Sequence, residues 1–259
     1  MARRSIDGLR VIVTGASSGI GRALVIELIQ SGAKVVAFAR RAERLEELKA
    51  AVSDAENLRC LAGDVTRRED RAAVLGLAQR EFGGLDALVN NAGVGALGRF
   101  DQADEARLRH IMEVNLFAPA EFIREALPTL RTGTKTIIVN VSSVLGHRAV
   151  PDKSEYCASK FALHGLSDAL RTELASNGIE VLLVSPSTTV SEFFDVASGG
   201  APRQTSRFGA MSAEVVARHM VAAMKSGRRE IILSLSGKLL VWIDRLCPPL
   251  ADWIVARWA

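Results

Sequence analysis

The sequence predicts a single α/β domain, in which seven parallel strands form a doubly wound sheet with helices on both faces. Short runs of β-branched and other apolar residues alternate with segments of helical periodicity over most of the 259 residues. A glycine-rich turn joins the first run to the first helix, as in a parallel βαβ unit. A chain of this length can bury one large core. The predicted strands are residues 10–14, 34–39, 57–61, 85–89 and 136–141, a sixth that reaches Val184, and 230–234.

The first βαβ unit carries a dinucleotide-binding pattern. Its first strand leads directly into Gly15-Ala-Ser-Ser-Gly19-Ile-Gly21, and the helix that follows ends at Gly32, before the second strand. Such a turn places pyrophosphate oxygens against the N–H groups at the start of the helix. The sequence therefore predicts a Rossmann-like cofactor site that includes Gly15, Ser17, Ser18, Gly19, Ile20 and Gly21.

The end of the second strand indicates which dinucleotide binds. An acidic residue there would bind the ribose 2′-hydroxyl of NAD, but this chain has Arg40 and Arg41 and no carboxylate. Guanidinium groups suit a 2′-phosphate through their charge and their fork geometry. The sequence therefore favours NADP(H) over the alternative that both arginines merely cap an exposed turn.

The third and fourth strands end in further candidate cofactor contacts. Asp64 and Val65 follow the third strand, where the acid could accept a hydrogen bond from the adenine amino group. A helix N-cap for residues 67–82 is an almost equally good interpretation of Asp64. Asn91, Ala92 and Gly93 follow the fourth strand, and small residues there allow the backbone to approach a ligand closely.

Asn115 lies within the helix predicted from Ala103 onward. Asparagine has poor helix propensity, because its side chain competes for backbone hydrogen bonds. Two interpretations stay open: the residue bends the helix and holds a water molecule, or it is a tolerated polar residue.

Tyr156 and Lys160 provide the candidate acid/base pair. Residues four apart on a helix lie on the same face, and Tyr156 is the only tyrosine in the chain. A nearby ammonium favours the phenolate, so we expect Lys160 to lower the pKa of Tyr156 toward neutrality. Ser143, just after the fifth strand, could hydrogen-bond the same substrate oxygen. The alternative is a half-buried tyrosine beside a solvated lysine.

In this order and spacing, the motifs resemble those of the short-chain dehydrogenase/reductase family over about residues 8–235. The resemblance implies that Tyr156 donates or accepts the proton and that Lys160 lowers its pKa and binds the nicotinamide ribose. It further implies that Ser143 orients the substrate oxygen, that Asn115 anchors a water in a proton relay, and that Arg40 marks NADP preference. A homodimer or homotetramer is expected.

One segment departs from the family pattern. The family usually has Pro-Gly after the sixth strand, whereas this chain has Pro186 followed by Ser187. Losing the glycine narrows the backbone freedom on the nicotinamide side. Thr189 and Ser191 stay candidate cofactor contacts, with Ser191 at the place of the usual threonine.

The C-terminal third is predicted to hold a substrate lid at about residues 190–210 and an apolar helical extension at 237–259, beyond a catalytic domain of residues 1–236. All three tryptophans lie in the extension. Packing over the substrate cleft or against another subunit is favoured over contact with a membrane surface. Four charged residues argue against a membrane span: Asp244, Arg245, Asp252 and Arg257.

Composition excludes several classes. The net charge of +4 comes without a Lys/Arg block, so no nucleic-acid partner is expected. Three distant cysteines form no disulfide framework and four histidines show no ligand spacing, so no metal site is predicted. Together with the lack of a signal-peptide pattern, the cysteine usage favours a cytoplasmic protein.

These observations predict an NADP(H)-dependent oxidoreductase that interconverts a carbonyl and a secondary alcohol on a small hydrophobic substrate. Two alternatives stay open. A nucleotide sensor or scaffold would bind NADP(H) without turnover, and an epimerase or dehydratase would use transient hydride transfer. The first often lacks the tyrosine or the lysine, and the second usually has a larger C-terminal domain.

Overall fold

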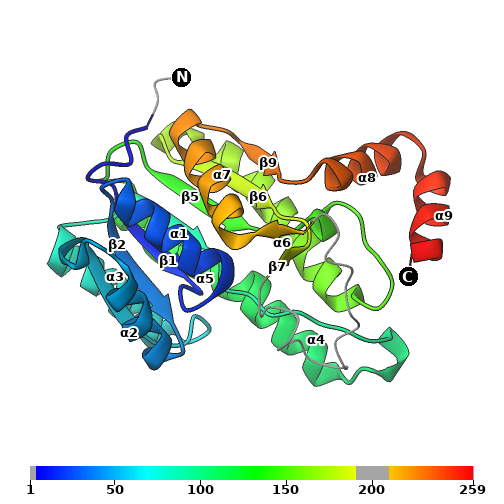
Figure 1. Cartoon of the computed structure of the whole chain (residues 1–259), viewed down its shortest axis with the longest axis horizontal. Helices are drawn as coiled ribbons and strands as arrows, with labels where there is room; N and C mark the ends of the chain where they lie inside the picture. Colours follow the sequence, from blue (N-terminus) through cyan, green and yellow to red (C-terminus); the bar gives the residue numbers. More distant parts are fainter. Residues whose placement is uncertain (1–3, 191–209, 259) are drawn as a thin grey trace.

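The computed structural model describes residues 4–190 and 210–258. The proposed lid and Ser191 therefore lie outside the described residues. Within them, seven strands form one parallel sheet in the order β3-β2-β1-β4-β5-β6-β9, which confirms the predicted fold class (Figure 1). The strands are β1 (Arg10–Thr14), β2 (Lys34–Ala39), β3 (Leu58–Ala62), β4 (Ala87–Asn90), β5 (Ile137–Val141), β6 (Glu180–Ser185) and β9 (Glu230–Ile232). A separate two-stranded ladder joins β7 (Thr189–Val190) to β8 (Met211–Ser212).

Helices cover both faces of the sheet. Successive residues of β1 point into opposite cores: Val11 and Val13 pack on one side, and Ile12 on the other. The first core includes residues of α1 and α7, and the second includes residues of α3 and α5. The helices are α1 (Gly19–Gln30), α2 (Ala42–Ala51), α3 (Arg68–Phe82), α4 (Glu105–Met112), α5 (Ala118–Leu130), α6 (Ser154–Glu173), α7 (Ala213–Ser226), α8 (Leu235–Leu246) and α9 (Pro248–Trp258), with short 3₁₀ turns η1 (Ala55–Asn57), η2 (Phe100–Gln102), η4 (Val144–Gly146) and η5 (Ala175–Asn177).

The sheet topology places the candidate residues at one edge. β1 pairs with both β2 and β4, so the direction of winding reverses between β1 and β4. Ligands of doubly wound sheets bind at this switch point, outside the carboxyl ends of the strands. The glycine turn after β1, Asn91 after β4 and Ser143 after β5 all lie at that end.

The helix predicted from Ala103 onward is interrupted. α4 ends at Met112, a π-helical turn η3 (Glu113–Phe117) follows, and α5 begins at Ala118 with Pro119 in its first turn. Asn115 is at the centre of the π turn and is fully buried. π turns inside helices are frequent at functional sites, because they redirect side chains without ending the helix.

The C-terminal extension forms α8 and α9, which extend beyond β9 at the periphery of the molecule (Figure 1). Val241, Ala251 and Val255 are buried, whereas Trp242 and Trp253 are 58% and 54% exposed. Trp242 and Trp253 are therefore largely exposed in the single chain, and packing over the substrate cleft or against another subunit stays a prediction. None of the described helices is both long and apolar enough to span a bilayer.

Candidate active site

Hydrogen bonds join the glycine turn to the loop after β4. The Thr14 hydroxyl oxygen accepts hydrogen bonds from the N–H groups of Asn91 and Ala92, both at 2.9 Å. The Asn91 carboxamide returns a bond of 2.9 Å to the Thr14 carbonyl. Gly15 has φ +65°, and a Cβ there would lie 2.8 Å from the Ala92 Cα. Close backbone approach and a left-handed conformation thus both require glycine at this position.

The start of α1 fits an anionic group. No side chain of the described residues caps the N–H groups at Ser18, and the first turn contains no acid. Free N–H groups and the positive end of the helix dipole both favour a phosphate. The predicted residues Ser17 to Gly21 therefore form a turn that suits a pyrophosphate.

Arg41 lies on this turn. Its guanidinium donates to the Ser18 hydroxyl at 2.8 Å and to the Ser17 hydroxyl at 3.2 Å. Arg40 is exposed, and its charge acts on Asp64 instead. The two arginines therefore occupy different places, and the cluster of hydroxyls and guanidinium around Arg41 suits a phosphate monoester.

Asp64 follows β3 in a tight turn and is not the N-cap of α3, which is Arg67. Burial opposes its ionisation, but hydrogen bonds from the N–H and the hydroxyl of Thr66, together with the charge of Arg40, hold its pKa below the usual value. One carboxylate oxygen accepts both Thr66 bonds, at 2.9 and 2.8 Å. Val65 beside it is buried, and its carbonyl accepts from Arg71.

The structure brings Ser143 and Tyr156 together. A hydrogen bond joins the Ser143 side chain to the Tyr156 hydroxyl. Both residues are buried, and Ser143 Oγ also accepts from the Leu145 N–H at 3.1 Å. Burial raises the pKa of Tyr156, and the bond to Ser143 offsets only part of that rise. The phenol is therefore neutral at physiological pH and can donate a proton.

Lys160 does not act on Tyr156 as the spacing predicts. Its Nζ donates to the Val141 carbonyl at 3.0 Å and lies 5.7 Å from the centroid of the Tyr156 ring. Burial lowers the pKa of Lys160 to about 8. The expectation that Lys160 brings the pKa of Tyr156 toward neutrality is wrong for this arrangement, because desolvation of the phenol dominates.

Asn115 acts as a clamp. Its Oδ1 accepts from the Val94 N–H at 2.9 Å, and its Nδ2 donates to the Val94 carbonyl and to Ser159 Oγ, both at 3.0 Å. Both amide hydrogens therefore have protein acceptors. The side chain joins the π turn, the loop after β4 and the helix that carries Tyr156.

The residues after β6 are placed only in part. The Pro186 carbonyl accepts from the Val144 N–H at 2.9 Å, which fixes the end of β6 against η4. The Thr189 hydroxyl donates to the Ser187 carbonyl at 3.1 Å, within its own turn.

Two buried polar contacts behind the site escaped the sequence analysis. Arg107 of α4 donates to Glu155, the neighbour of Tyr156, at 2.6 Å, and both side chains are almost fully buried. Asn90 donates to Asn140 at 2.9 Å across β4 and β5. Polar residues at the ends of apolar strands were the available signal for the second contact. No local pattern links Arg107 to Glu155.

Comparison with known proteins agrees with this geometry. The family model for short chain dehydrogenases matches residues 10–198. A dehydrogenase/reductase SDR family protein 7-like of Anopheles gambiae is 30% identical, over 98% of this chain and 84% of that protein. A short-chain dehydrogenase structure from Streptomyces avermitilis is 30% identical, with a TM-score of 0.79 over 96% of this chain and 97% of its own. A Burkholderia cenocepacia structure in complex with NADP is 25% identical, with a TM-score of 0.81 over 97% and 99%. The chain belongs to the short-chain dehydrogenase/reductase family of oxidoreductases.

Proposed function

We propose that the protein is an NADP(H)-dependent oxidoreductase that interconverts a carbonyl and a secondary alcohol. The observation that carries the proposal is the buried, hydrogen-bonded pair of Ser143 and Tyr156. Lys160 lies one helical turn beyond Tyr156, and the pair is at the same end of the sheet as the glycine turn. Two hydroxyl groups that are hydrogen-bonded to each other can both bind a single substrate oxygen.

The roles of the residues follow from their protonation. When bound, the nicotinamide would supply or accept the hydride. In the reductive direction Tyr156, neutral because burial raises its pKa, donates its proton to the substrate oxygen, and the Ser143 hydroxyl holds that oxygen in place. Lys160 has a pKa of about 8, so it is mostly protonated at pH 7, and its ammonium is the proposed donor to the nicotinamide ribose when the cofactor is bound. Asn115 keeps the helix of Tyr156 in register with the loop after β4.

The preference for NADP(H) rests on Arg41, Ser17 and Ser18. These side chains form a cationic, hydroxyl-rich cluster beside the glycine turn, and the end of β2 carries no acid for a ribose 2′-hydroxyl. Asp64, Val65, Asn91, Ala92 and Gly93 remain proposed contacts of the adenine and ribose. Similar solved structures hold either cofactor, NADP in the one from Burkholderia cenocepacia and NAD in one from Burkholderia phymatum, so the choice rests on these side chains.

The two alternative functions are less well supported. A sensor without turnover has no need for the Ser143–Tyr156 pair with Lys160 beside it. An epimerase or dehydratase usually has a larger C-terminal substrate domain, whereas the described residues after β9 form the two short helices α8 and α9.

A screen of carbonyl compounds tests the proposal. NADPH oxidation should be followed with aldehydes and ketones of increasing chain length, and NADH should be run in parallel. We expect turnover of at least one apolar carbonyl series, with NADPH preferred. NADPH binding without turnover of any carbonyl would favour the sensor, and a preference for NADH would refute the cofactor assignment.

We also propose that α8 and α9 contact an anionic membrane surface. Six apolar side chains form an exposed apolar ridge along the two helices: Leu235, Leu239, Trp242, Leu246, Leu250 and Trp253. Both acids of the two helices, Asp244 and Asp252, are paired with Arg148 of the main body. Lys238, Arg245 and Arg257 stay exposed beside the ridge. An apolar face with exposed cations on the same helices suits anionic lipid.

Vesicle binding tests this contact. The full chain should co-sediment with phosphatidylserine-containing vesicles, and its tryptophan emission should shift to the blue. Trp242→Ser combined with Leu246→Ser should abolish both effects, whereas Phe100→Ser, at an exposed apolar side chain elsewhere, should not. If the ridge variant instead converts a dimer or tetramer into monomers and vesicles have no effect, a second copy of the chain covers the ridge. Light scattering of the same samples without vesicles measures the oligomeric state, for which we predict a homodimer or homotetramer.

A further inference from the structure

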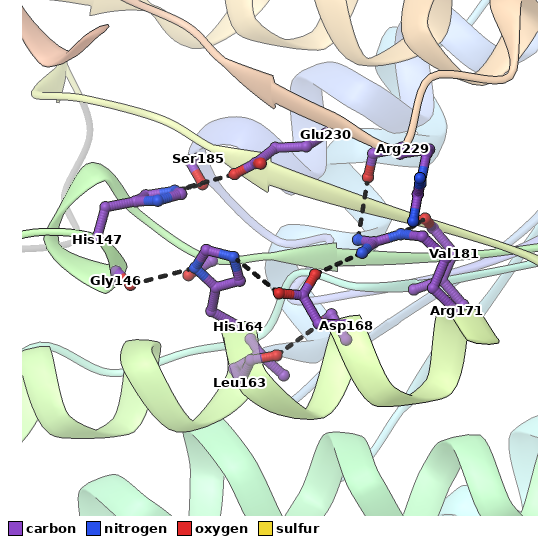
Figure 2. Close-up of polar contacts among 12 residues, drawn as sticks. Gly146, His147, Leu163, His164, Asp168, Arg171, Val181, Ser185, Arg229 and Glu230 are labelled. Carbon is purple, nitrogen blue, oxygen red and sulfur yellow. Dashed lines mark hydrogen bonds and ion pairs between the residues drawn. The ribbon is translucent and has the colours of Figure 1, made fainter. Parts of the chain in front are cut away.

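Two histidines and a glutamate from three elements meet beside the active site. His147 follows η4, His164 lies one turn beyond Lys160 on α6, and Glu230 begins β9. One ligating atom from each of these three residues lies within 4.8 Å of the others. Figure 2 shows His147 extended toward Glu230 and Ser185, and the two imidazole rings have centroids 4.5 Å apart. The sequence predicts no metal site, since the three residues are distant along the chain.

His147 has one nitrogen that lacks a partner. Its side chain is only 2% exposed, and its Nε2 lies 2.9 Å from Ser185 Oγ and 3.1 Å from Glu230 Oε1. Its Nδ1 is buried and has no hydrogen-bond partner among the described residues. With the ring proton on Nδ1, the lone pair of Nε2 faces the Glu230 carboxylate at 3.1 Å, and a cation between them would be bound by both.

His164 faces an oxygen at each nitrogen. Its Nδ1 lies 3.3 Å from the Gly146 carbonyl oxygen, and its Nε2 lies 3.5 Å from Asp168 Oδ2 (Figure 2). In a tautomer with one N–H, the single acceptor nitrogen of the ring faces an oxygen. A cation next to that nitrogen would remove this repulsion. A carboxylate that holds the other N–H is the usual support of a metal-ligating histidine, and Asp168 is itself held by an ion pair with Arg171.

We propose that His147, His164 and Glu230 bind a divalent transition-metal ion of the Zn²⁺ type, with Asp168 orienting the His164 imidazole. Zn²⁺ prefers imidazole nitrogen and carboxylate oxygen, and ligand atoms around a tetrahedral ion lie ~3.3 Å apart. The distance between His147 Nε2 and Glu230 Oε1 already matches that spacing. Side-chain rotation of His164 has to close the remaining separation.

The ion would act as a brace behind the catalytic residues. It would join the turn that directly follows Ser143, the helix that carries Tyr156 and Lys160, and the edge strand β9. β9 pairs only with β6 within the described sheet, so its position depends on few other contacts. Zn²⁺ should therefore stabilise the folded chain by mass action.

Zn²⁺ titration of the full chain tests the proposal. The protein should be prepared without a histidine tag, freed of metal by chelator dialysis, and titrated by calorimetry and thermal unfolding. We expect a single equivalent to bind and to raise the Tm. His164→Gln and Glu230→Gln change partly exposed side chains, so they should fold, and both should lose the binding. Asp168→Asn should weaken it by about 10- to 100-fold.

Two control variants separate this site from other ligands. His219→Gln, at an exposed histidine of α7, and Cys247→Ser, at the exposed thiol, should bind Zn²⁺ like the wild type. Co²⁺ should give visible d–d bands without a thiolate charge-transfer band. The proposal is overturned if the wild type binds no Zn²⁺, if His164→Gln and Glu230→Gln retain full affinity, or if Cys247→Ser abolishes the binding.

Discussion

The carboxamide of Asn115 is hydrogen-bonded to both backbone groups of Val94, at 2.9 Å through Oδ1 and 3.0 Å through Nδ2. A third bond joins the same side chain to Ser159 on α6. One fully buried residue therefore connects the loop after β4 to the helix that carries Tyr156.

Replacing this clamp should cost both stability and activity. Asn115→Ala leaves the Val94 N–H and carbonyl without their partner, at a cost of about 1–3 kcal/mol for each buried unsatisfied group. Urea unfolding measures the loss, and kcat should fall with it because α6 is less firmly placed. Asn177→Ala, at an exposed asparagine of η5, is the matched control. Unchanged stability in Asn115→Ala would show that the clamp contributes nothing.

The ion pair of Arg107 and Glu155 should behave as a buried pair. Arg107→Met leaves the Glu155 carboxylate buried without its partner, and we expect a loss of about 3–5 kcal/mol in the free energy of unfolding. Adding Glu155→Met should recover most of this loss, since a well-packed apolar pair can replace a buried ion pair. Arg99→Met, in an exposed ion pair with Asp101, should change little. A double variant as unstable as the single one would contradict this account.

The buried ammonium of Lys160 should make stability depend on pH. Its pKa is about 8 in the folded chain against an ordinary 10.5. Below pH 8 both states carry the proton, and the folded state bears the full cost of burying the charge. Between pH 8 and 10.5 only the unfolded state keeps the proton, so wild-type stability should rise with pH.

Lys160→Met removes this titration. The free energy of unfolding of the wild type, relative to that of the variant, should therefore increase from pH 7 to pH 9.5, by at most about 3 kcal/mol. Tyr156 is present in both proteins, so its own titration largely cancels. A difference that does not change with pH would mean that Lys160 is not desolvated.

Arg41 should contribute more to NADPH affinity than Arg40. Arg41→Gln removes a charge-assisted contact beside Ser17 and Ser18, so NADPH affinity should fall by about tenfold or more while NADH affinity stays the same. Arg40→Gln should have a smaller effect, and the exposed Arg67→Gln should have none. Fluorescence titration of both cofactors into the four proteins measures the order. Equal wild-type affinity for NADH and NADPH would refute the assignment.

Local patterns in the sequence predicted the fold and the identity of the central residues. The parallel strands follow from short apolar runs, and the turn after β1 follows from the spacing of its glycines. The structure gives the physical reason for Gly15, because a side chain there would collide with Ala92. Tyr156 and Lys160 were found by their spacing, which fixes a shared helix face. That spacing does not fix burial, and burial determines the pKa of both residues.

The features that local patterns did not predict depend on contacts between segments that are distant in the sequence. The Lys160 ammonium bonds Val141 of β5, and Arg41 rather than Arg40 lies on the glycine turn. The exposure of Trp242 also depends on which face of α8 packs inward, and the short apolar pattern of that helix left more than one choice.

Turnover by Tyr156→Phe tests the central claim most directly. The variant keeps the ring but loses the hydroxyl that bonds Ser143 and that we propose as the proton donor. On a carbonyl substrate that the wild type reduces, kcat should fall by ~10²–10⁴-fold, while NADPH binding measured by fluorescence stays near the wild-type value. A variant that retains near wild-type kcat would contradict the role of Tyr156 as the proton donor, and with it the proposed mechanism.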